Sequence, residues 1–194
     1  EAGHSGTRSS WDWVVDPLDG TLNFSREIPH YCASVALRRE GESVAGVIYD
    51  PVRDELFAAA AGRGATLNGR PIRVSRVDRA QDAVVTAGFM KDPATIQAGL
   101  NWMGQVLPRV RKVRMMGAAA LDLAWVACGR LDAYMEAGVR TWDIAAGTLI
   151  VREAGGRVET GPLPDRAEAH RLLAWNGRFD LPPVLWAPGT GVEA

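Results

Sequence analysis

Residues 13–24 read Trp13-Val14-Val15-Asp16-Pro17-Leu18-Asp19-Gly20-Thr21-Leu22-Asn23-Phe24, and this stretch organises the fold around it. Apolar residues with high strand propensity lead into an Asp-Pro-x-Asp-Gly-Thr turn. Pro17 lacks an N–H group and is expected to end the hydrogen-bond ladder of the strand. Gly20 permits a tight backbone turn, and Thr21 is expected to cap the segment that follows. The sequence therefore predicts a strand that ends in a turn bearing two carboxylates.

These two carboxylates suggest a metal site. Asp16 and Asp19 are three residues apart across the turn, so both can reach one cation, and hard ions such as Mg²⁺ prefer oxygen ligands. The N–H groups of Gly20 and Thr21, at a helix N-terminus, suit a phosphate. Asp-Pro and Asp-Gly are also common turn dipeptides, and either one alone favours a structural role. An EF-hand calcium loop is excluded because Leu18 stands where that loop needs an oxygen ligand.

A second motif, Trp142-Asp143-Ile144-Ala145-Ala146-Gly147, lies in the C-terminal half of the chain. Together the two motifs resemble the signatures of the inositol monophosphatase family, which are Mg²⁺-dependent phosphomonoesterases, in the family's order and at about its separation. The similarity continues through residues 62–69 to residues 153–156 and covers nearly the whole chain. It implies an α+β fold, a layered αβαβα sandwich of the inositol monophosphatase/fructose-1,6-bisphosphatase type.

The start of the chain departs from this pattern. The sequence opens on Glu1 rather than Met, in a Gly- and Ser-rich loop, whereas family members carry about two helices before this point. We therefore expect a fragment that lacks the N-terminal helices and an upstream catalytic acid. Without those helices, one face of a sheet should lie bare.

The resemblance implies a set of metal ligands. Asp143 would close the site opposite Asp16 and Asp19, with the backbone carbonyl of Leu18 as a further ligand. Glu1, fifteen residues before Asp16, matches an upstream glutamate that is also a ligand in the family. The implied cofactor is Mg²⁺, as two or three ions, with Mn²⁺ as a substitute and Li⁺ as an inhibitor. From the residues alone, Asp143 fits a carboxylate at a helix dipole better than a metal ligand, and Glu1 fits solvated surface equally well.

Catalytic and substrate-binding roles also follow from the resemblance. Glu1, Thr21 and Asp16 would position or activate the attacking water. The implied substrate contacts are Asp19, Gly20, Thr21, Gly117, Ala118, Ala119, Glu136 and Asp143. Glu136 lies seven residues before Asp143, where inositol phosphatases bind ring hydroxyls, although an exposed Glu at a strand end is an equal alternative. The family usually has Ser or Thr at the position of Ala118, which weakens the case for strict inositol specificity.

The function implied is the Mg²⁺-dependent hydrolysis of a small phosphomonoester, with inositol monophosphate as the first choice. Relatives also hydrolyse fructose-1,6-bisphosphate, histidinol phosphate and 3′-phosphoadenosine nucleotides. A non-catalytic protein that binds a partner on the same fold is the alternative from another class, and the intact acidic residues and Thr21 argue against it. Relatives are commonly homodimers, so a homodimer is expected.

Composition limits the other function classes. The chain has 194 residues, 47% of them hydrophobic, and a net charge of −1, so no electrostatic case exists for a nucleic-acid or membrane partner. Cys32 and Cys128 are far apart and lack CxxC spacing, so they are expected to be reduced and buried, as in a cytoplasmic protein, with a disulfide as the open alternative. The three histidines are scattered and predicted to be surface or structural, and the seven tryptophans to serve the core and interfaces.

The pattern along the chain predicts strands first, then strands alternating with helices. Pro93–Leu107 is expected to be a helix with Asp92 as its N-cap, and Gly117–Gly129 a helix with one apolar face. Asn68-Gly69 predicts a hairpin turn. This pattern predicts a division of the chain into residues 1–82, which contain the antiparallel sheet, and residues 83–194, which form an α/β half. The further elements expected are strands at 31–39, 43–49, 55–60, 83–87, 110–115, 131–136, 157–159 and 171–174, and a helix at 142–154.

Overall fold

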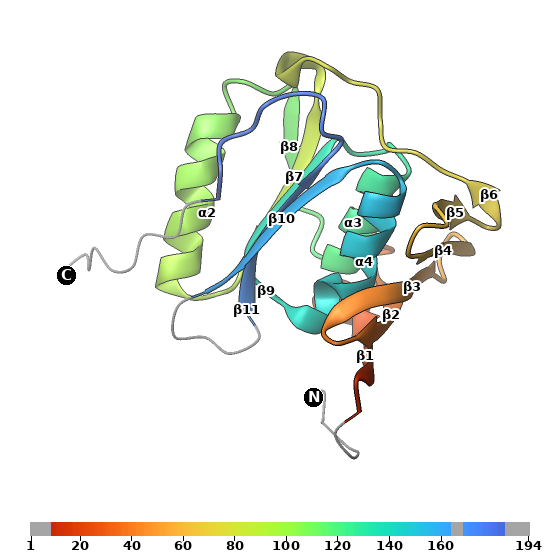
Figure 1. Ribbon diagram of the computed structural model, residues 1–194. Coiled ribbons are helices and arrows are strands. Elements are labelled where there is room, and N and C mark those ends of the chain that lie inside the picture. Colours follow the sequence, from red (N-terminus) through yellow and green to blue (C-terminus); the bar gives the residue numbers. More distant parts are fainter. Residues whose placement is uncertain (1–8, 164–168, 185–194) are drawn as a thin grey trace.

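The computed structural model describes residues 9–163 and 169–184, and the first half of the chain forms an antiparallel sheet. Its six strands follow one another in sequence order, each paired with the next (Figure 1). They are β1 (Trp11–Asp19), β2 (Cys32–Arg39), β3 (Glu42–Asp50), β4 (Glu55–Ala60), β5 (Ala65–Leu67) and β6 (Arg70–Pro71). The short helix α1 (Thr21–Ser25) follows β1 directly, so the Asp-Pro-x-Asp-Gly-Thr turn sits at one end of this sheet.

The second half of the chain forms a mixed five-stranded sheet in the order β10-β11-β9-β7-β8. The strand β7 is parallel to both of its neighbours, β8 and β9, whereas β11 is antiparallel to both of its neighbours, β9 and β10. These strands are β7 (Val84–Phe89), β8 (Lys112–Arg114), β9 (Ala133–Arg140), β10 (Arg157–Pro162) and β11 (Ala169–Trp175). The short 3₁₀ helix Ala80–Asp82 links the two halves of the chain.

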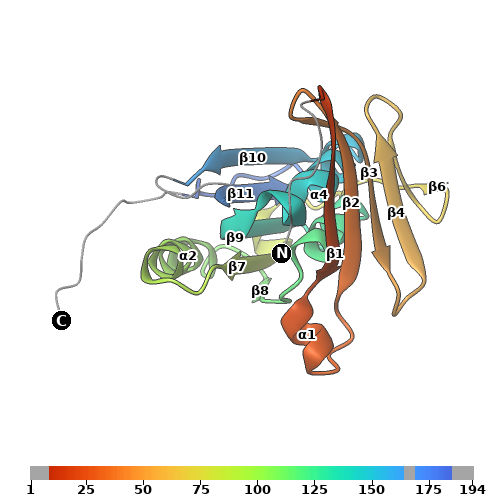
Figure 2. The ribbon, with the colours of Figure 1, turned by 90° about the horizontal axis from the view of Figure 1, so that it is seen from below.

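Three longer helices complete the layers: α2 (Pro93–Val106), α3 (Ala119–Ala127) and α4 (Thr141–Glu153). Figure 2 shows α3 and α4 between the two sheets and α2 on the far face of the second sheet. One core fills the space around α3 and α4, and a second core lies between the second sheet and α2. The described chain is thus a βαβα stack, four layers of the α+β sandwich that the resemblance implies.

The outer face of the first sheet is uncovered by the described residues, as expected. The large apolar side chains that this face exposes are Trp11, Trp13, Val15, Val47, Tyr49 and Leu56. Trp13 is 68% exposed. The expectation that the tryptophans serve the core or interfaces therefore holds for the buried Trp102 and Trp175, but Trp11 and Trp13 are exposed in the described chain.

The structure confirms two local predictions, the helix cap at Asp92 and the hairpin turn at Asn68-Gly69. The side chain of Asp92 caps α2 by accepting hydrogen bonds from the N–H groups of Ala94 and Thr95, both at 3.1 Å, and Pro93 is the first helical residue. Asn68 and Gly69 form the two-residue turn between β5 and β6, with φ angles of 48° and 76°. Positive φ at both positions is what such a hairpin turn requires.

Other local predictions were wrong. Pro17 does not end β1; the ladder to β2 is interrupted after Asp16 and resumes at Asp19. The helix α3 has no single apolar face, because nearly all its residues are buried between the two sheets. Cys128 is a half-buried free thiol, not a buried one, whereas Cys32 is buried and free. The strand β9 extends to Arg140, beyond the predicted residue 136, because β11 pairs along its whole length.

The division of the chain between residues 82 and 83 stays a prediction. In the fold that boundary separates the strands of the first sheet from those of the second. Among the described residues, no helix is both long and apolar enough to cross a membrane.

Candidate metal centre

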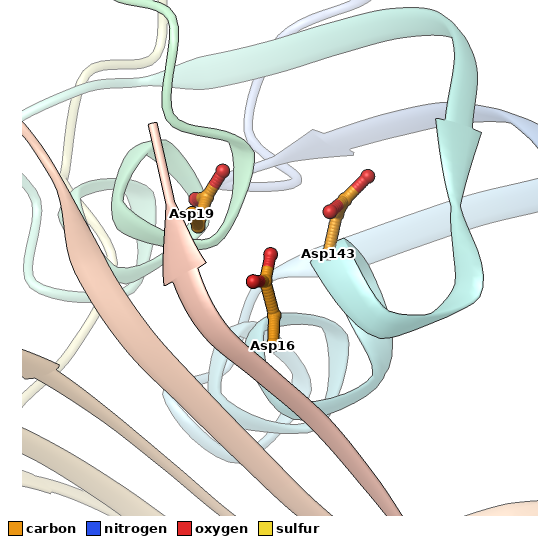
Figure 3. A group of neighbouring side chains, drawn as sticks. All are labelled: Asp16, Asp19 and Asp143. Carbon is orange, nitrogen blue, oxygen red and sulfur yellow. The ribbon is translucent and has the colours of Figure 1, made fainter. Parts of the chain in front are cut away.

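The structure brings Asp16, Asp19 and Asp143 together (Figure 3). One carboxylate oxygen from each lies within 4.8 Å of those of the other two. Asp16 and Asp19 come from the end of β1, and Asp143 comes from the first turn of α4, more than a hundred residues later. The cluster forms because α4, in the middle layer, packs against β1 of the first sheet.

Asp19 is the most buried member of the cluster. Its Oδ2 accepts a hydrogen bond of 2.7 Å from the backbone N–H of Ala120, near the N-terminus of α3, and the Cys32 thiol lies 3.7 Å from the same atom. Burial raises the pKa of Asp19 to about 7, against the lowering effect of the Ala120 N–H, and the charge of Asp16 raises it further. Asp19 thus lies where its negative charge lacks full compensation.

The turn after Asp16 is built by local hydrogen bonds. Asp16 Oδ1 accepts from the N–H of Leu18 at 3.0 Å, and the Thr21 hydroxyl donates to the Leu18 carbonyl at 2.9 Å. The prediction that Thr21 caps the following helix is therefore wrong. Gly20 holds that position without a side-chain cap, in the left-handed region with φ of 82°. The Leu18 carbonyl, one predicted ligand, keeps a second lone pair free of the Thr21 contact.

Gly20 is required by its surroundings as well as by its φ angle. A Cβ atom at this position would lie 2.9 Å from the His30 carbonyl oxygen and 3.1 Å from the Cβ of Ala118. The turn that carries Asp19 and Thr21 is therefore pressed between the segment around His30 and the start of α3.

Asp143 occupies the helix-dipole position that its motif allows. Its Oδ2 accepts from the N–H of Arg140 at 2.9 Å and closes the first turn of α4. Burial raises the pKa of Asp143 to about 7, and the charges of Asp19 and Asp16 contribute in the same direction. Helix capping and membership of the acidic cluster are thus combined in one side chain.

The cluster fits a hard divalent cation. All three donors are carboxylate oxygens, which suit Mg²⁺. Burial and mutual repulsion raise the pKa values of Asp19 and Asp143, and a cation bound here would offset both effects.

Glu136 lies beside this cluster, on β9. Its Oε2 accepts a short hydrogen bond from the buried Tyr134 hydroxyl, and Gly88 on β7 leaves the room that its carboxylate occupies. Burial raises its pKa to about 7, opposed by the Tyr134 hydrogen bond and assisted by the charge of Asp143. The alternative of an exposed strand-end glutamate is therefore wrong.

The segment Gly117-Ala118-Ala119 lies at the N-terminus of α3. Gly117 has a φ angle of 84°, and the buried Ala118 is the N-cap residue. Because the Cβ of Ala118 approaches Gly20, this segment borders the same turn as the acidic cluster. Glu1 lies outside the described residues.

Sequence reasoning missed Asp122, whose buried carboxylate contacts the ring of His30 at 3.0 Å. Asp122 is one acidic residue in an otherwise apolar helix, a pattern that could have drawn attention to it. It also missed Asn23, whose side chain donates to the carbonyls of His30 and Met116, both at 2.8 Å. His30 was predicted to be surface or structural, and the structure shows it buried.

Comparison with known proteins defines the class. The model of the inositol monophosphatase family matches residues 1–174, so the chain belongs to that family. The Nus factor SuhB of Xylella fastidiosa is 50% identical, over 93% of this chain and 70% of that protein. Further Nus factors SuhB are matched over 58% of their length, so the chain spans less than two thirds of those relatives.

Solved structures agree in fold. The extragenic suppressor protein SuhB from Bartonella henselae superposes with a TM-score of 0.80 at 43% identity, over 87% of this chain and 66% of that one. Inositol monophosphatase from Anabaena superposes with a TM-score of 0.78 at 42% identity, over 88% and 68%. The fold is therefore the α+β fold of this family.

Proposed function

We propose that the protein hydrolyses a small phosphomonoester with Mg²⁺, and that inositol monophosphate is the first substrate to test. The observation that carries this proposal is the meeting of Asp16, Asp19 and Asp143, whose carboxylate oxygens lie within 4.8 Å of one another. Family membership supports it.

The ligands we propose are the carboxylates of Asp16, Asp19 and Asp143 and the carbonyl of Leu18, with Glu1 as a further candidate. Bound Mg²⁺ would neutralise the phosphate dianion, lower the pKa of the attacking water and stabilise the leaving alkoxide. Mn²⁺ as a substitute and Li⁺ as an inhibitor stay predictions.

The turn residues would orient the reactants. The Thr21 hydroxyl donates a hydrogen bond to the Leu18 carbonyl, so its oxygen can accept a hydrogen bond from the attacking water. The N–H groups of Gly20 and Thr21, at the start of α1, would face the phosphate oxygens. Asp16 and Glu1 are the proposed acceptors of the proton that the water loses.

Glu136 is the proposed contact for a hydroxyl of the leaving group. Tyr134 holds one of its oxygens, which leaves the other to accept from a substrate hydroxyl. Gly117, Ala118 and Ala119 would form the neighbouring wall of the pocket. Because Ala118 offers no hydroxyl, we expect a broader substrate range than inositol phosphates alone.

The test is phosphate release from a panel of phosphomonoesters by the full-length protein, with and without Mg²⁺. The panel contains inositol monophosphate, fructose-1,6-bisphosphate, histidinol phosphate and a 3′-phosphoadenosine nucleotide. Metal-dependent release that disappears in the Asp143→Asn variant supports the proposal. A folded, Mg²⁺-binding protein that releases phosphate from none of them overturns it.

A second candidate function is partner binding in a transcription complex. It is favoured by one observation, that relatives 45–50% identical are named Nus factors. Binding would use the surface and would not need the acidic cluster. Affinity purification of the wild type and Asp143→Asn from the native host tests this: transcription proteins retained equally by both support it, and their absence from both contradicts it. A homodimer and a cytoplasmic location are proposed alongside either function.

A further inference from the structure

A buried contact between the side chains of His30 and Asp122 lies close to Asp19 and has no part in the chemistry proposed above. His30 Nε2 and Asp122 Oδ1 are 3.0 Å apart, and the two side chains are 6% and 2% exposed. Thr86 Oγ1 on β7 donates to the other Asp122 oxygen at 2.9 Å. Both oxygens of this buried carboxylate are therefore engaged, one by each of two separate segments.

The pair joins the two walls that hold Asp19. Asp122 belongs to α3, and the same helix donates the Ala120 N–H to Asp19 Oδ2 at 2.7 Å. His30 belongs to the segment between α1 and β2, which packs against the turn carrying Asp19. The distance between these two walls thus depends on a contact between two side chains behind the site.

Close packing transmits this distance to the metal ligands. The His30 carbonyl and the Cβ of Ala118 press on Gly20 from two sides, so that no Cβ fits there. Asn23 reinforces the arrangement by donating to the carbonyls of His30 and Met116, one on each wall. A shift of His30 relative to α3 would therefore move Gly20, and with it the neighbouring Asp19.

The position of the His30 ring depends on a small number of contacts. His30 Nδ1 is buried and has no hydrogen-bond partner among the described residues, so the ring is held through Nε2 and by the edge-to-face contact with Trp125. Removing one partner of a buried hydrogen bond leaves the polar group of the other partner unsatisfied. The ring and the carboxylate therefore depend on each other for their positions.

We propose that His30 and Asp122 are positioning residues that set the metal affinity of the acidic cluster by fixing the turn of Asp19 against α3. The inference rests on the proposed metal site but not on any particular substrate. Outer partners of metal ligands typically contribute 10–100-fold to metal affinity, which sets the size of the expected effect.

The test measures Mg²⁺ binding to the full-length protein by isothermal titration calorimetry, with no substrate present. We expect Asp122→Asn and His30→Asn each to weaken Mg²⁺ binding about 10–100-fold. The double variant should be little worse than either single variant, because both act through one contact. Thr86→Val, which removes a single hydrogen bond at nearly constant volume, should weaken binding in the same direction and serves if Asp122→Asn does not fold.

The His30 variant separates positioning from simple charge. Asp122→Asn replaces an acidic group and could weaken cation binding from a distance, whereas His30→Asn leaves Asp122 in place. Mg²⁺ binding that is unchanged or tighter in His30→Asn would overturn the proposal. Phosphate release by either variant, if the protein is a phosphatase, should recover toward the wild-type rate at saturating Mg²⁺.

Asp132 provides the matched control for stability. It is another buried aspartate, 6% exposed, which accepts from the Ser75 hydroxyl at 2.5 Å and the Val84 N–H at 2.6 Å. Asp132→Asn should lower the melting temperature as Asp122→Asn does and leave Mg²⁺ affinity within about twofold. If Asp122→Asn, His30→Asn and Thr86→Val lower only the melting temperature, like this control, the pair is merely structural and the proposal fails. A wild type that binds Mg²⁺ but hydrolyses nothing overturns the proposed function alone.

Discussion

Asp19 and Asp143 share a conflict between burial and charge. Each has a pKa raised to about 7, first by burial and further by neighbouring carboxylates. Each is also held by a backbone N–H, from Ala120 and Arg140 respectively, so neither can turn away from the other. A site that fixes repelling carboxylates in place is prepared for a cation at some cost to the metal-free protein.

The pH dependence of Mg²⁺ binding follows from these pKa values. Protons compete with Mg²⁺ for Asp19 and Asp143, so Mg²⁺ affinity should rise as the pH increases from 6 to 8 and level off above. Titration calorimetry at several pH values measures this rise. An affinity that is flat across this range would contradict the raised pKa values.

The same pKa shifts make the stability of the metal-free protein change with pH in the opposite direction from its Mg²⁺ affinity. A raised carboxyl pKa contributes stability at pH below the ordinary value, and that stability is lost as the pH rises through about 7. Metal-free wild type should therefore lose stability relative to Asp143→Asn between pH 4 and 7.5. Urea denaturation of both proteins across this range shows whether it does.

Asp16→Asn should abolish Mg²⁺-dependent phosphate release and leave the fold nearly intact. The variant removes a metal ligand, but it also removes repulsion against Asp19 and Asp143. Asp12→Asn is the matched control on the same strand, because among the described residues the Asp12 side chain pairs with Arg38 near the surface, at 2.5 Å. That exposed pair is worth at most about 1 kcal/mol, and its loss should leave phosphate release unchanged. Full turnover in Asp16→Asn would show that the metal assignment is wrong.

At the scale of elements, the close approach of α4 to the first sheet places Asp143 opposite Asp16. Gly46 on β3 makes this approach possible. A Cβ atom there would lie 2.9 Å from the Cα of Ala146 and 3.1 Å from its Cβ, on the helix that begins with the second motif. The separation of helix and sheet is thus set by a residue in neither motif.

Gly46→Ala should lower the free energy of unfolding by about 1–3 kcal/mol, because the backbone of α4 must move to admit the methyl group. Gly104→Ala in the exposed part of α2 is the control, since a Cβ there meets nothing within 4 Å. That change should raise the free energy of unfolding by up to about 1 kcal/mol through helix propensity. Urea denaturation compares the two, and equal effects of both substitutions would contradict the packing argument.

At the scale of the whole molecule, the middle helical layer belongs to both sheets. Buried residues of α3 and α4 form one core with residues from each sheet, including Ile48 and Phe57 of the first and Leu172 and Ala174 of the second. Asp16 and Asp19 lie on the first sheet, and Asp143 lies on α4 in the helical layer between the two sheets. A cation bound by all three residues therefore links the first sheet to this helical layer.

Mg²⁺ should therefore stabilise the whole fold. At a concentration of about 100 times the dissociation constant, binding to the folded state alone adds about 2.7 kcal/mol. Calorimetric scans should show a rise of several degrees in the melting temperature of the wild type. Asp143→Asn should show almost no rise, and an equal rise in both proteins would place the ion elsewhere.

Sequence alone determined the features that depend on neighbours along the chain. The capping of α2 by Asp92, the Asn68-Gly69 hairpin and the residues of the two acidic motifs could all be predicted, because turn and cap preferences act over a few residues. The family resemblance extended this to the layered fold.

Only the tertiary structure decided how the parts meet. The distance from Asp143 to Asp16 depends on how α4 packs, and the raised pKa values depend on burial in the folded chain. The His30–Asp122 contact spans 92 residues and leaves no local signature. Such contacts follow from the packing of whole layers, whose many side chains act together, and no short pattern along the chain encodes them.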